Sequence, residues 1–237
     1  MVDKNPNRIR RMFGQIAPRY DRMNHLLSLQ TDRYWRYRTV RLVPPRGTAP
    51  ILDVCCGTGD LALAYRRRAD RKAVVVGSDF CREMLRIARR RREQSDLAGI
   101  DFVEADTLRL PFPDDLFQIV SVAFGLRNVA DTDGGLREMT RVCQPGGRVA
   151  VLEFSMPSWQ PGRALYGWYF RHILPRLGQW LARNDQDAYH YLPDSVGQFP
   201  QGEALLERMR RAGLHDVRQY RFTMGVATLY TGRKGPP

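Results

Sequence analysis

A glycine-rich turn that follows a short apolar segment constrains the fold of this chain more than any other feature. The apolar segment, residues 51–56, runs directly into the sequence GTGD at residues 57–60. An apolar strand followed by a tight glycine turn and a helix is typical of the first unit of a doubly wound α/β sheet, where the turn approaches a bound nucleotide or nucleoside. The rest of the chain is then expected to supply further strands that alternate with helices.

Further strand-like runs occur at the spacing that such a sheet requires. Continuous apolar runs predict parallel strands buried on both faces at residues 51–56, 73–80, 100–106, 119–124 and 148–154. Two later runs, residues 215–222 and 226–232, are separated by a short segment containing Gly225 and predict an antiparallel hairpin. We therefore predict an α/β, Rossmann-like fold with a seven-stranded, mostly parallel sheet that ends in a C-terminal antiparallel hairpin.

The length of the chain fits one large domain with appendages. At 237 residues and 43% hydrophobic composition, the chain can bury a sizeable core. We expect a single domain over residues 1–237, composed of a helical cap (1–50), a cofactor-binding core (51–154), a lid or membrane-facing insertion (155–200), and a C-terminal helix with its hairpin (201–237).

Charge and hydropathy indicate where the protein works and what it meets. No run reaches the about 18 apolar residues of a membrane span, and residues 1–11 lack the apolar part of a secretory signal, so we expect a cytoplasmic protein. The net charge of +13 suits nucleic acid, an anionic membrane face or acidic ligands, although arginine runs on solvated helix faces explain it equally well. The four cysteines form no CxxC pair, and we expect them to be small buried residues rather than metal ligands.

The acids around the glycine turn distinguish between two kinds of nucleoside cofactor. Gly57, Gly59 and Ala62 satisfy the dinucleotide pattern G-x-G-x-x-G/A, so NAD or a flavin has to be considered. A pyrophosphate would have to approach the turn, and the carboxylates of Asp53 and Asp60 would repel it. S-adenosylmethionine carries an ammonium and a sulfonium instead, so the local charge favours this cofactor. Asp60 also suits a helix N-terminus for structural reasons alone.

Later strands supply more candidate contacts to a nucleoside. Asp79 ends the second strand about 20 residues beyond the turn, where a carboxylate accepts both ribose hydroxyls. Asp106 and Thr107 follow the third strand, and Asp106 is a candidate acceptor for the adenine amine. Phe80 and Met84 are candidates to pack on the adenine, with ordinary core packing as the alternative for both.

These features resemble class I methyltransferases, and within them the chain resembles the ubiquinone/menaquinone biosynthesis C-methyltransferase family. The resemblance covers about residues 10–232, and the motif pair YDRMN and FGLRN is more selective than the glycine turn. The CCGTGD form of the turn looks closer to demethylmenaquinone methyltransferases. The matching stretches are residues 17–36, 52–62, 110–117, 124–131, 144–157 and 189–205.

The resemblance implies cofactor contacts and a reaction. The positions that match the family's S-adenosylmethionine contacts are Thr58, Asp79, Asp106 and Thr107. Before FGLRN some members have a serine that contacts the cofactor, and Ala123 replaces it here. The implied reaction is C-methylation of a membrane-resident, polyprenylated quinol, 2-demethylmenaquinol to menaquinol. A ubiquinone-pathway benzoquinol, a tocopherol-type quinol and a sterol are alternative acceptors.

Candidate catalytic residues lie in FGLRN, just beyond the fourth strand. Arg127 is expected to stabilise a developing phenolate, and Asn128 to orient a hydroxyl or a water. A structural ion pair of Arg127 with an acid such as Asp131 is the alternative. Tyr20 and Asp21 are expected to close over the cofactor, with plain packing or capping as the alternative.

Residues 159–182 mix aromatic side chains with arginine, which suits either a lid or an interfacial anchor on an anionic membrane. If these residues are an interfacial anchor, the protein is expected on the inner face of the membrane. His190 and Tyr191 are weaker candidates for the quinol pocket. Two other classes of function stay open: an NAD-dependent oxidoreductase, and a non-catalytic nucleic-acid-binding protein. No RNP-like motif, GXXG clamp or zinc finger supports the second, so we expect no nucleic-acid partner.

Overall fold

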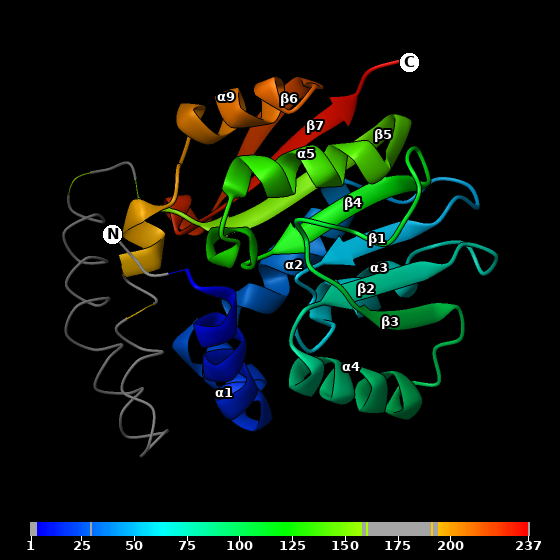
Figure 1. Ribbon diagram of the computed structural model, residues 1–237, viewed down its shortest axis with the longest axis vertical. Helices are drawn as coiled ribbons and strands as arrows, with labels where there is room; N and C mark the ends of the chain where they lie inside the picture. The colour runs from blue at the N-terminus through cyan, green and yellow to red at the C-terminus, as the bar shows by residue number, and fades with distance from the viewer. Residues whose placement is uncertain (1–3, 29, 158–159, 161–190, 192–193, 237) are drawn as a thin grey trace.

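The computed structural model describes residues 4–28, 30–157, 160, 191 and 194–236, which include a seven-stranded sheet in the order β3-β2-β1-β4-β5-β7-β6 (Figure 1). Strands β1 to β5 pair in parallel, β7 is antiparallel to β5, and β6 is antiparallel to β7. The predicted fold is therefore confirmed. The strands are β1 Ile51–Val54, β2 Val75–Asp79, β3 Ile100–Glu104, β4 Phe117–Ala123, β5 Cys143–Phe154, β6 Leu214–Phe222 and β7 Ala227–Lys234.

Two strand ends differ from the sequence prediction for identifiable reasons. Strand β1 stops at Val54 because Cys55 adopts a left-handed backbone with φ 48°, which starts the turn two residues before its first glycine, Gly57. Strand β5 begins at Cys143 rather than at residue 148. The predicted strand began after Pro145, Gly146 and Gly147, but Phe117 pairs with Cys143 ahead of a register shift, so the strand includes this irregular stretch.

Helices cover both faces of the sheet. Figure 1 shows α5 and α9 in front of the sheet and α2 and α3 behind it. Buried apolar side chains form one core on each side, the first including Trp35 and Leu61 and the second including Leu136 and Leu205. The helices whose full extent lies within the described residues are α1 Pro6–Leu27, α2 Thr31–Leu42, α3 Asp60–Arg66, α4 Arg82–Gln94, α5 Thr132–Val142 and α9 Glu203–Arg211, with 3-10 turns η1 Leu126–Asn128 and η3 Thr223–Gly225.

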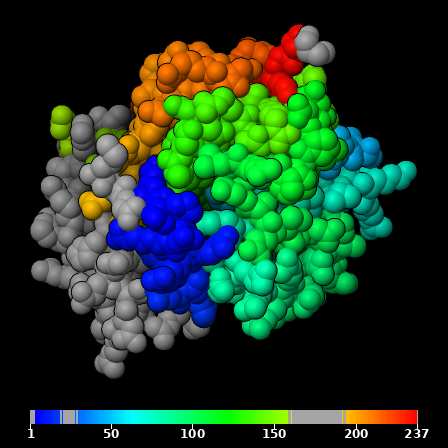
Figure 2. All heavy atoms as spheres, in the orientation of Figure 1, coloured from blue at the N-terminus to red at the C-terminus, as the bar shows by residue number. Residues whose placement is uncertain are grey.

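Helix α1 lies beside the carboxyl ends of the parallel strands, the edge at which doubly wound sheets bind ligands (Figure 1). It packs on α4, and in the space-filling view it lies against the surface of the sheet domain (Figure 2). Within the described residues, no helix combines the length and the apolarity that crossing a bilayer requires.

Gly77 in β2 tests how tightly the sheet and its covering side chains pack. A Cβ on Gly77 would lie 2.6 Å from Phe102 and 3.0 Å from the Cys56 sulfur. We predict that Gly77→Ala lowers the free energy of unfolding by about 1–3 kcal/mol, because the added methyl overpacks the core. The control is Gly197→Ala, where a Cβ would have no neighbour within 4 Å. Equal denaturant midpoints for the two variants would contradict the packing described.

Candidate functional site

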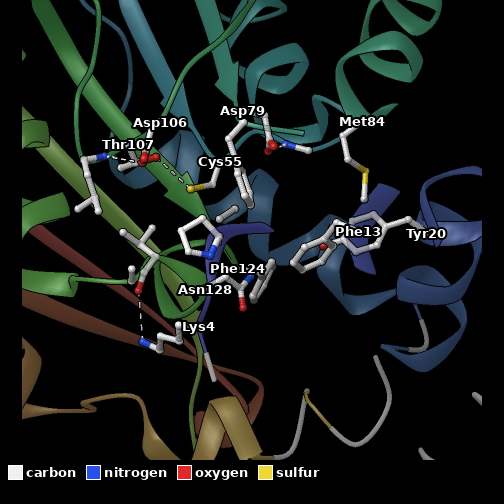
Figure 3. A pocket seen from close by; sticks show the side chains of 18 residues that line it. Lys4, Phe13, Tyr20, Cys55, Asp79, Met84, Asp106, Thr107, Phe124 and Asn128 are labelled. Carbon is white, nitrogen blue, oxygen red and sulfur yellow. Dashed lines mark hydrogen bonds between the residues drawn. The ribbon is translucent and has the colours of Figure 1, made fainter. Parts of the chain in front are cut away.

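A pocket opens at the carboxyl edge of the sheet, between the strand ends and helix α1 (Figure 3). The pocket encloses about 720 Å³ of space when its open mouth is counted. The ends of β1, β2 and β4, the loop after β3, helix α1 and the residues just before α1 all contribute to its lining.

Asp79 lines the pocket and holds two turns in place. Its Oδ2 accepts a hydrogen bond from the Gly57 backbone N–H at 2.8 Å, and its Oδ1 accepts one from the Cys81 N–H at 2.8 Å. Burial raises the pKa of Asp79 to about 6, against the opposing effect of these backbone donors. The carboxylate therefore lies where the sequence predicted a ribose contact, and each oxygen keeps acceptor capacity for a ligand hydroxyl.

Asp106 and Thr107 line the pocket on the side away from α1 (Figure 3). Asp106 is exposed and its Oδ1 accepts from the Leu108 N–H at 2.9 Å, so the loop after β3 is held in a tight turn. Thr107 is buried, and its hydroxyl lies 3.2 Å from the Cys55 sulfur. The pair thus connects the loop after β3 to the start of the glycine turn.

Aromatic and apolar side chains form the opposite wall. Phe80 and Met84 line the pocket, and Tyr20 and Phe13 reach it from α1 with their rings in edge contact at 5.9 Å. In Figure 3 Phe13, Tyr20 and Met84 lie on the same side. Flat apolar surface next to the acceptor of Asp79 suits a nucleoside.

The FGLRN segment forms the floor of the pocket. Phe124 has a left-handed backbone, φ 58°, and its ring packs 4.4 Å from Phe154 and 5.9 Å from Trp35, centroid to centroid. Gly125 follows, where a Cβ would lie 2.4 Å from that of Cys55, so the close approach of the two turns requires glycine. This geometry brings the side chain of Asn128 to the pocket lining.

Asn128 and Lys4 lie at the end of the pocket away from Met84 (Figure 3). The side-chain oxygen of Asn128 is buried and has no hydrogen-bond partner among the described residues. The Lys4 ammonium donates to the Val129 carbonyl at 3.4 Å, a long contact, and within the described part of the chain it forms no salt bridge. Burial lowers the pKa of Lys4, and the charge of Glu153 opposes this shift.

Three residues expected at the cofactor lie outside the pocket lining. Asp53 is buried beneath it, accepts from the Ser121 hydroxyl at 2.7 Å, and has its pKa raised to about 7 by burial. The Thr58 hydroxyl and carbonyl accept from Arg91 at 3.2 and 3.1 Å. Gly59 begins α3 with φ 86°, and a Cβ there would touch the Phe102 ring. These three residues shape the turn, whereas Gly57 borders the pocket with open space where its Cβ would be.

Asp60 does not supply the electrostatic effect that the sequence argument assigned to it. Its carboxylate forms ion pairs with Arg91 at 2.5 Å and with Arg36 at 3.4 Å. Two arginines compensate its charge, so it would not repel a pyrophosphate as a free carboxylate would. The acids that line the pocket are Asp79 and Asp106.

Arg127 lies under the pocket floor in a buried ion pair. Its guanidinium pairs with Glu153 of β5 at 2.9 Å, its backbone N–H donates to the same carboxylate at 3.2 Å, and it also donates to the Phe124 carbonyl. The side chains are only 6% and 1% exposed. Arg127 therefore has the structural ion pair that was the alternative interpretation, but its partner is Glu153. Asp131 instead caps α5 and pairs with Arg137.

Four residues at or under the pocket were not predicted from the sequence, namely Lys4, Phe13, Cys55 and Glu153. Glu153 carried a signal, because a single carboxylate in a continuous apolar strand requires a buried cation nearby. No sequence signal marks Lys4, because it reaches the pocket only through the path that the chain takes before α1.

Other predicted residues have a different placement. His190, the side chain of Asp21 and the insertion 159–182 except residue 160 lie outside the described residues. Tyr191 is buried and packs with Ile9 and Met12 beside α1. All four cysteines are free, and the described residues hold no cluster of potential metal ligands.

Comparison with known proteins identifies the chain's relatives. Residues 1–234 match the model of the ubiE/COQ5 methyltransferase family. The chain belongs to this family. It is 48% identical over 221 residues to the demethylmenaquinone methyltransferase of Thermus thermophilus, covering 93% of this chain and 99% of that protein. It is 43% identical over 229 residues to the ubiquinone/menaquinone biosynthesis C-methyltransferase UbiE of Geobacter sulfurreducens, covering 96% and 89%.

Solved structures share the fold at low sequence identity. An S-adenosylmethionine-dependent methyltransferase of Thermotoga maritima, described as a possible histamine N-methyltransferase, superimposes with a TM-score of 0.66 at 18% identity over 94% of this chain and 99% of that one. The [4+2]-cyclase SpnF superimposes with a TM-score of 0.68 at 18% identity, covering 97% and 96%. A cyclase and a methyltransferase on one fold mean that the fold alone does not specify the reaction.

The Arg127–Glu153 pair gives a stability prediction for this site. Arg127→Ala leaves the Glu153 carboxylate buried without its cation, and we predict a loss of about 3–5 kcal/mol in the free energy of unfolding. The double variant Arg127→Met, Glu153→Gln removes both charges and keeps an acceptor for the Arg127 N–H, so it should lose much less. Denaturant unfolding of the single and double variants measures both. If Arg127→Ala is as stable as the parent, the ion pair does not stabilise the fold and the prediction is wrong.

Proposed function

We propose that this protein uses S-adenosylmethionine to methylate a ring carbon of a reduced, polyprenylated naphthoquinol, converting 2-demethylmenaquinol to menaquinol. The observation that carries the proposal is the nearly full-length similarity, at 48% identity, to a protein named demethylmenaquinone methyltransferase. The pocket supports it, since its two ends offer different chemistry to two ligands.

The pocket residues fit S-adenosylmethionine. Asp79, Asp106, Phe80 and Met84 all line the pocket. In this proposal Asp79 accepts the ribose hydroxyls, Asp106 accepts from the adenine amine, and Phe80 and Met84 pack on the base. Gly57 leaves room for a ligand to approach the backbone of the turn. Tyr20 lines the pocket from α1, and Thr107 supports the loop that carries Asp106. When bound, the cofactor supplies an electrophilic methyl group.

Asn128 and Lys4 are proposed to face the acceptor. The unpartnered Asn128 oxygen can accept a hydrogen bond from a quinol hydroxyl and fix the orientation of the ring. The Lys4 ammonium favours loss of a hydroxyl proton to water, because a cation stabilises the phenolate that forms, and a phenolate makes the ring carbon more nucleophilic. After this carbon has received the methyl group, it loses its own proton to water, which restores the aromatic ring. Arg127 contributes indirectly, because it holds Phe124 and the η1 turn in place.

The substrate's location follows from its chemistry. A polyprenyl chain partitions into the bilayer, so we propose a cytoplasmic enzyme that works peripherally on the inner face of the membrane. The net charge of +13 supports attraction to anionic lipid.

The experiment that tests the proposed function is methyl transfer from labelled S-adenosylmethionine to reduced acceptors. Demethylmenaquinol, a ubiquinone-pathway benzoquinol and a tocopherol-type quinol should be compared under reducing conditions, with the oxidised quinones as blanks. Turnover of demethylmenaquinol well above the others is expected. Turnover of another quinol only would reassign the substrate, and calorimetric binding of NAD in place of S-adenosylmethionine would overturn the proposal.

The raised pKa of Asp79 makes cofactor binding depend on pH. The carboxylate is ionised above about pH 6, and only the ionised form accepts both ribose hydroxyls. Affinity for S-adenosylmethionine should therefore weaken as the pH falls through 6. We predict that Asp79→Asn binds roughly 10- to 100-fold more weakly at pH 8 and lacks the step near pH 6. Calorimetric titration from pH 5 to 8 measures both.

The matched control is Asp96→Asn, since Asp96 is exposed and has a left-handed backbone that asparagine also tolerates. This variant should keep the parent's affinity and its pH profile. A step that persists in Asp79→Asn would assign the titration to another group.

Lys4 gives a kinetic prediction. Lys4→Met should lower kcat for the quinol by about 100-fold and leave the affinity for S-adenosylmethionine unchanged, because the ammonium acts on the acceptor oxygen. Lys4→Arg should restore part of the rate, and Lys72→Met, at an exposed lysine, is the control. Steady-state kinetics and calorimetry decide. Weaker cofactor binding with unchanged kcat would place Lys4 at the cofactor's carboxylate instead.

A further inference from the structure

The outward face of helix α2 is unusual for a helix on the surface of a protein. Tyr34 and Tyr37 are 46% and 52% exposed, and Arg33 and Arg41 beside them are exposed as well. The one acid of α2, Asp32, is buried and engaged by Arg36. The exposed face of α2 is therefore aromatic and cationic, without a compensating carboxylate of its own.

Each tyrosine on this face is paired with an arginine one turn further along. Arg38 lies 5.8 Å from the Tyr34 ring centroid and donates to its hydroxyl at 2.9 Å. Arg41 lies 5.8 Å from the Tyr37 ring centroid and donates to its hydroxyl at 3.0 Å. Two equivalent pairs at i, i+4 spacing form a row of apolar rings edged by guanidinium groups, a combination typical of the membrane–water interface.

The connection between β6 and β7 extends this face with an apolar tip. Met224 is 70% exposed and has a left-handed backbone, φ 53°, which a methionine rarely adopts. The tip is fixed to α2, since Trp35 Nε1 donates to the Thr223 hydroxyl at 2.8 Å and Tyr34 packs edge-on against Phe222 at 6.4 Å. Met224 and the α2 tyrosines therefore belong to one rigid surface.

This surface lies next to the pocket. Trp35, on the inner side of α2, packs 5.9 Å from Phe124, which lines the pocket. The tip precedes Ala227, whose pairing with Phe154 places it at the carboxyl end of β5. The tip and the start of α2 thus lie at the carboxyl edge of the sheet, where the pocket opens. From there α2 runs across the sheet toward the opposite edge, where Arg148 of β5 donates to the Pro44 carbonyl just beyond α2.

We propose that Arg33, Tyr34, Tyr37, Arg38, Arg41 and Met224 form the surface that docks on an anionic lipid bilayer, and we call it the α2 surface. The guanidinium groups contact lipid headgroups, while the tyrosine rings and Met224 enter the interfacial layer. The inference rests on the proposed function, in which the substrate is held in the bilayer. None of the described helices can span a membrane, so the protein needs a surface that brings its pocket to the bilayer.

Two observations favour a bilayer over single-stranded nucleic acid. A guanidinium already lies over each exposed tyrosine ring, which leaves less of the ring for base stacking. Met224, the most exposed large apolar side chain of the described residues, offers neither a stacking plane nor a hydrogen-bond donor to a base, but it suits insertion among acyl chains.

The test is sedimentation of the full-length protein with vesicles. Vesicles of phosphatidylglycerol and phosphatidylcholine are compared with phosphatidylcholine alone, at low and high salt. The parent should bind the anionic vesicles, and salt should weaken the binding. The double variant Arg38→Glu, Arg41→Glu should bind at least about 30-fold more weakly, the loss expected when two basic residues leave an anionic surface.

A matched control keeps the net charge equal. Arg86→Glu, Arg90→Glu reverses two exposed arginines on α4 and should bind close to the parent. Met224→Asn tests insertion separately, since asparagine tolerates the left-handed backbone, and it should reduce the binding that survives at high salt. Equal losses in the α4 and α2 double variants would show a general charge effect and overturn the proposal.

Turnover of a short-chain, water-soluble quinol without vesicles separates this proposal from the proposed function. The Arg38→Glu, Arg41→Glu variant should keep that turnover and lose turnover of vesicle-embedded quinol. If the parent turns over the soluble quinol but does not bind anionic vesicles, the proposal for the α2 surface is wrong and the proposed function stands. If the parent binds vesicles through this surface but methylates no quinol, the proposal for the α2 surface stands and the proposed function is wrong. Tight binding of single-stranded RNA with no vesicle binding would also overturn the proposal.

Discussion

The site depends on one buried carboxylate, Asp79, and the two backbone N–H groups that it accepts from. These two hydrogen bonds, to Gly57 and Cys81, join the glycine turn after β1 to the start of α4. Burying a carboxylate is costly, and its raised pKa records that cost, while the N–H groups offset part of it. Each carboxylate oxygen keeps acceptor capacity beyond its backbone hydrogen bond, so the group that orders the turn is also the one that we propose accepts the ribose hydroxyls of the cofactor.

A second buried charge supports the floor in the same way. The Glu153 carboxylate accepts from both the backbone and the guanidinium of Arg127, and this fixes the FGLRN segment against β5. The arrangement lets Phe124 keep a left-handed backbone, since the carbonyl of Phe124 is itself bound by Arg127. Conformations of this kind persist only where the surroundings hold them, and they occur often at functional sites.

Sequence patterns predicted the fold well because its signals are local. Apolar runs and glycine turns specify the strands and their ends to within a few residues, and Asp79, Asp106 and Thr107 were found because parallel strands bring their carboxyl ends to one edge. The charge argument for Asp60 was wrong because its two arginine partners come from α2 and α4, distant in sequence. Lys4 and Glu153 likewise act through long-range contacts. The catalytic assignments remain predictions for the kinetic experiments.

The thiol of Cys55 has a practical consequence for anyone who wishes to block this pocket. Cys55 borders the pocket, yet burial raises its pKa well above that of an ordinary thiol, and the nearby Asp79 carboxylate acts in the same direction. The reactive thiolate is therefore scarce at neutral pH. Electrophilic warheads aimed at Cys55 should label it slowly, and the same property protects the pocket from peroxide. Inhibitors of this enzyme are better designed as reversible ligands.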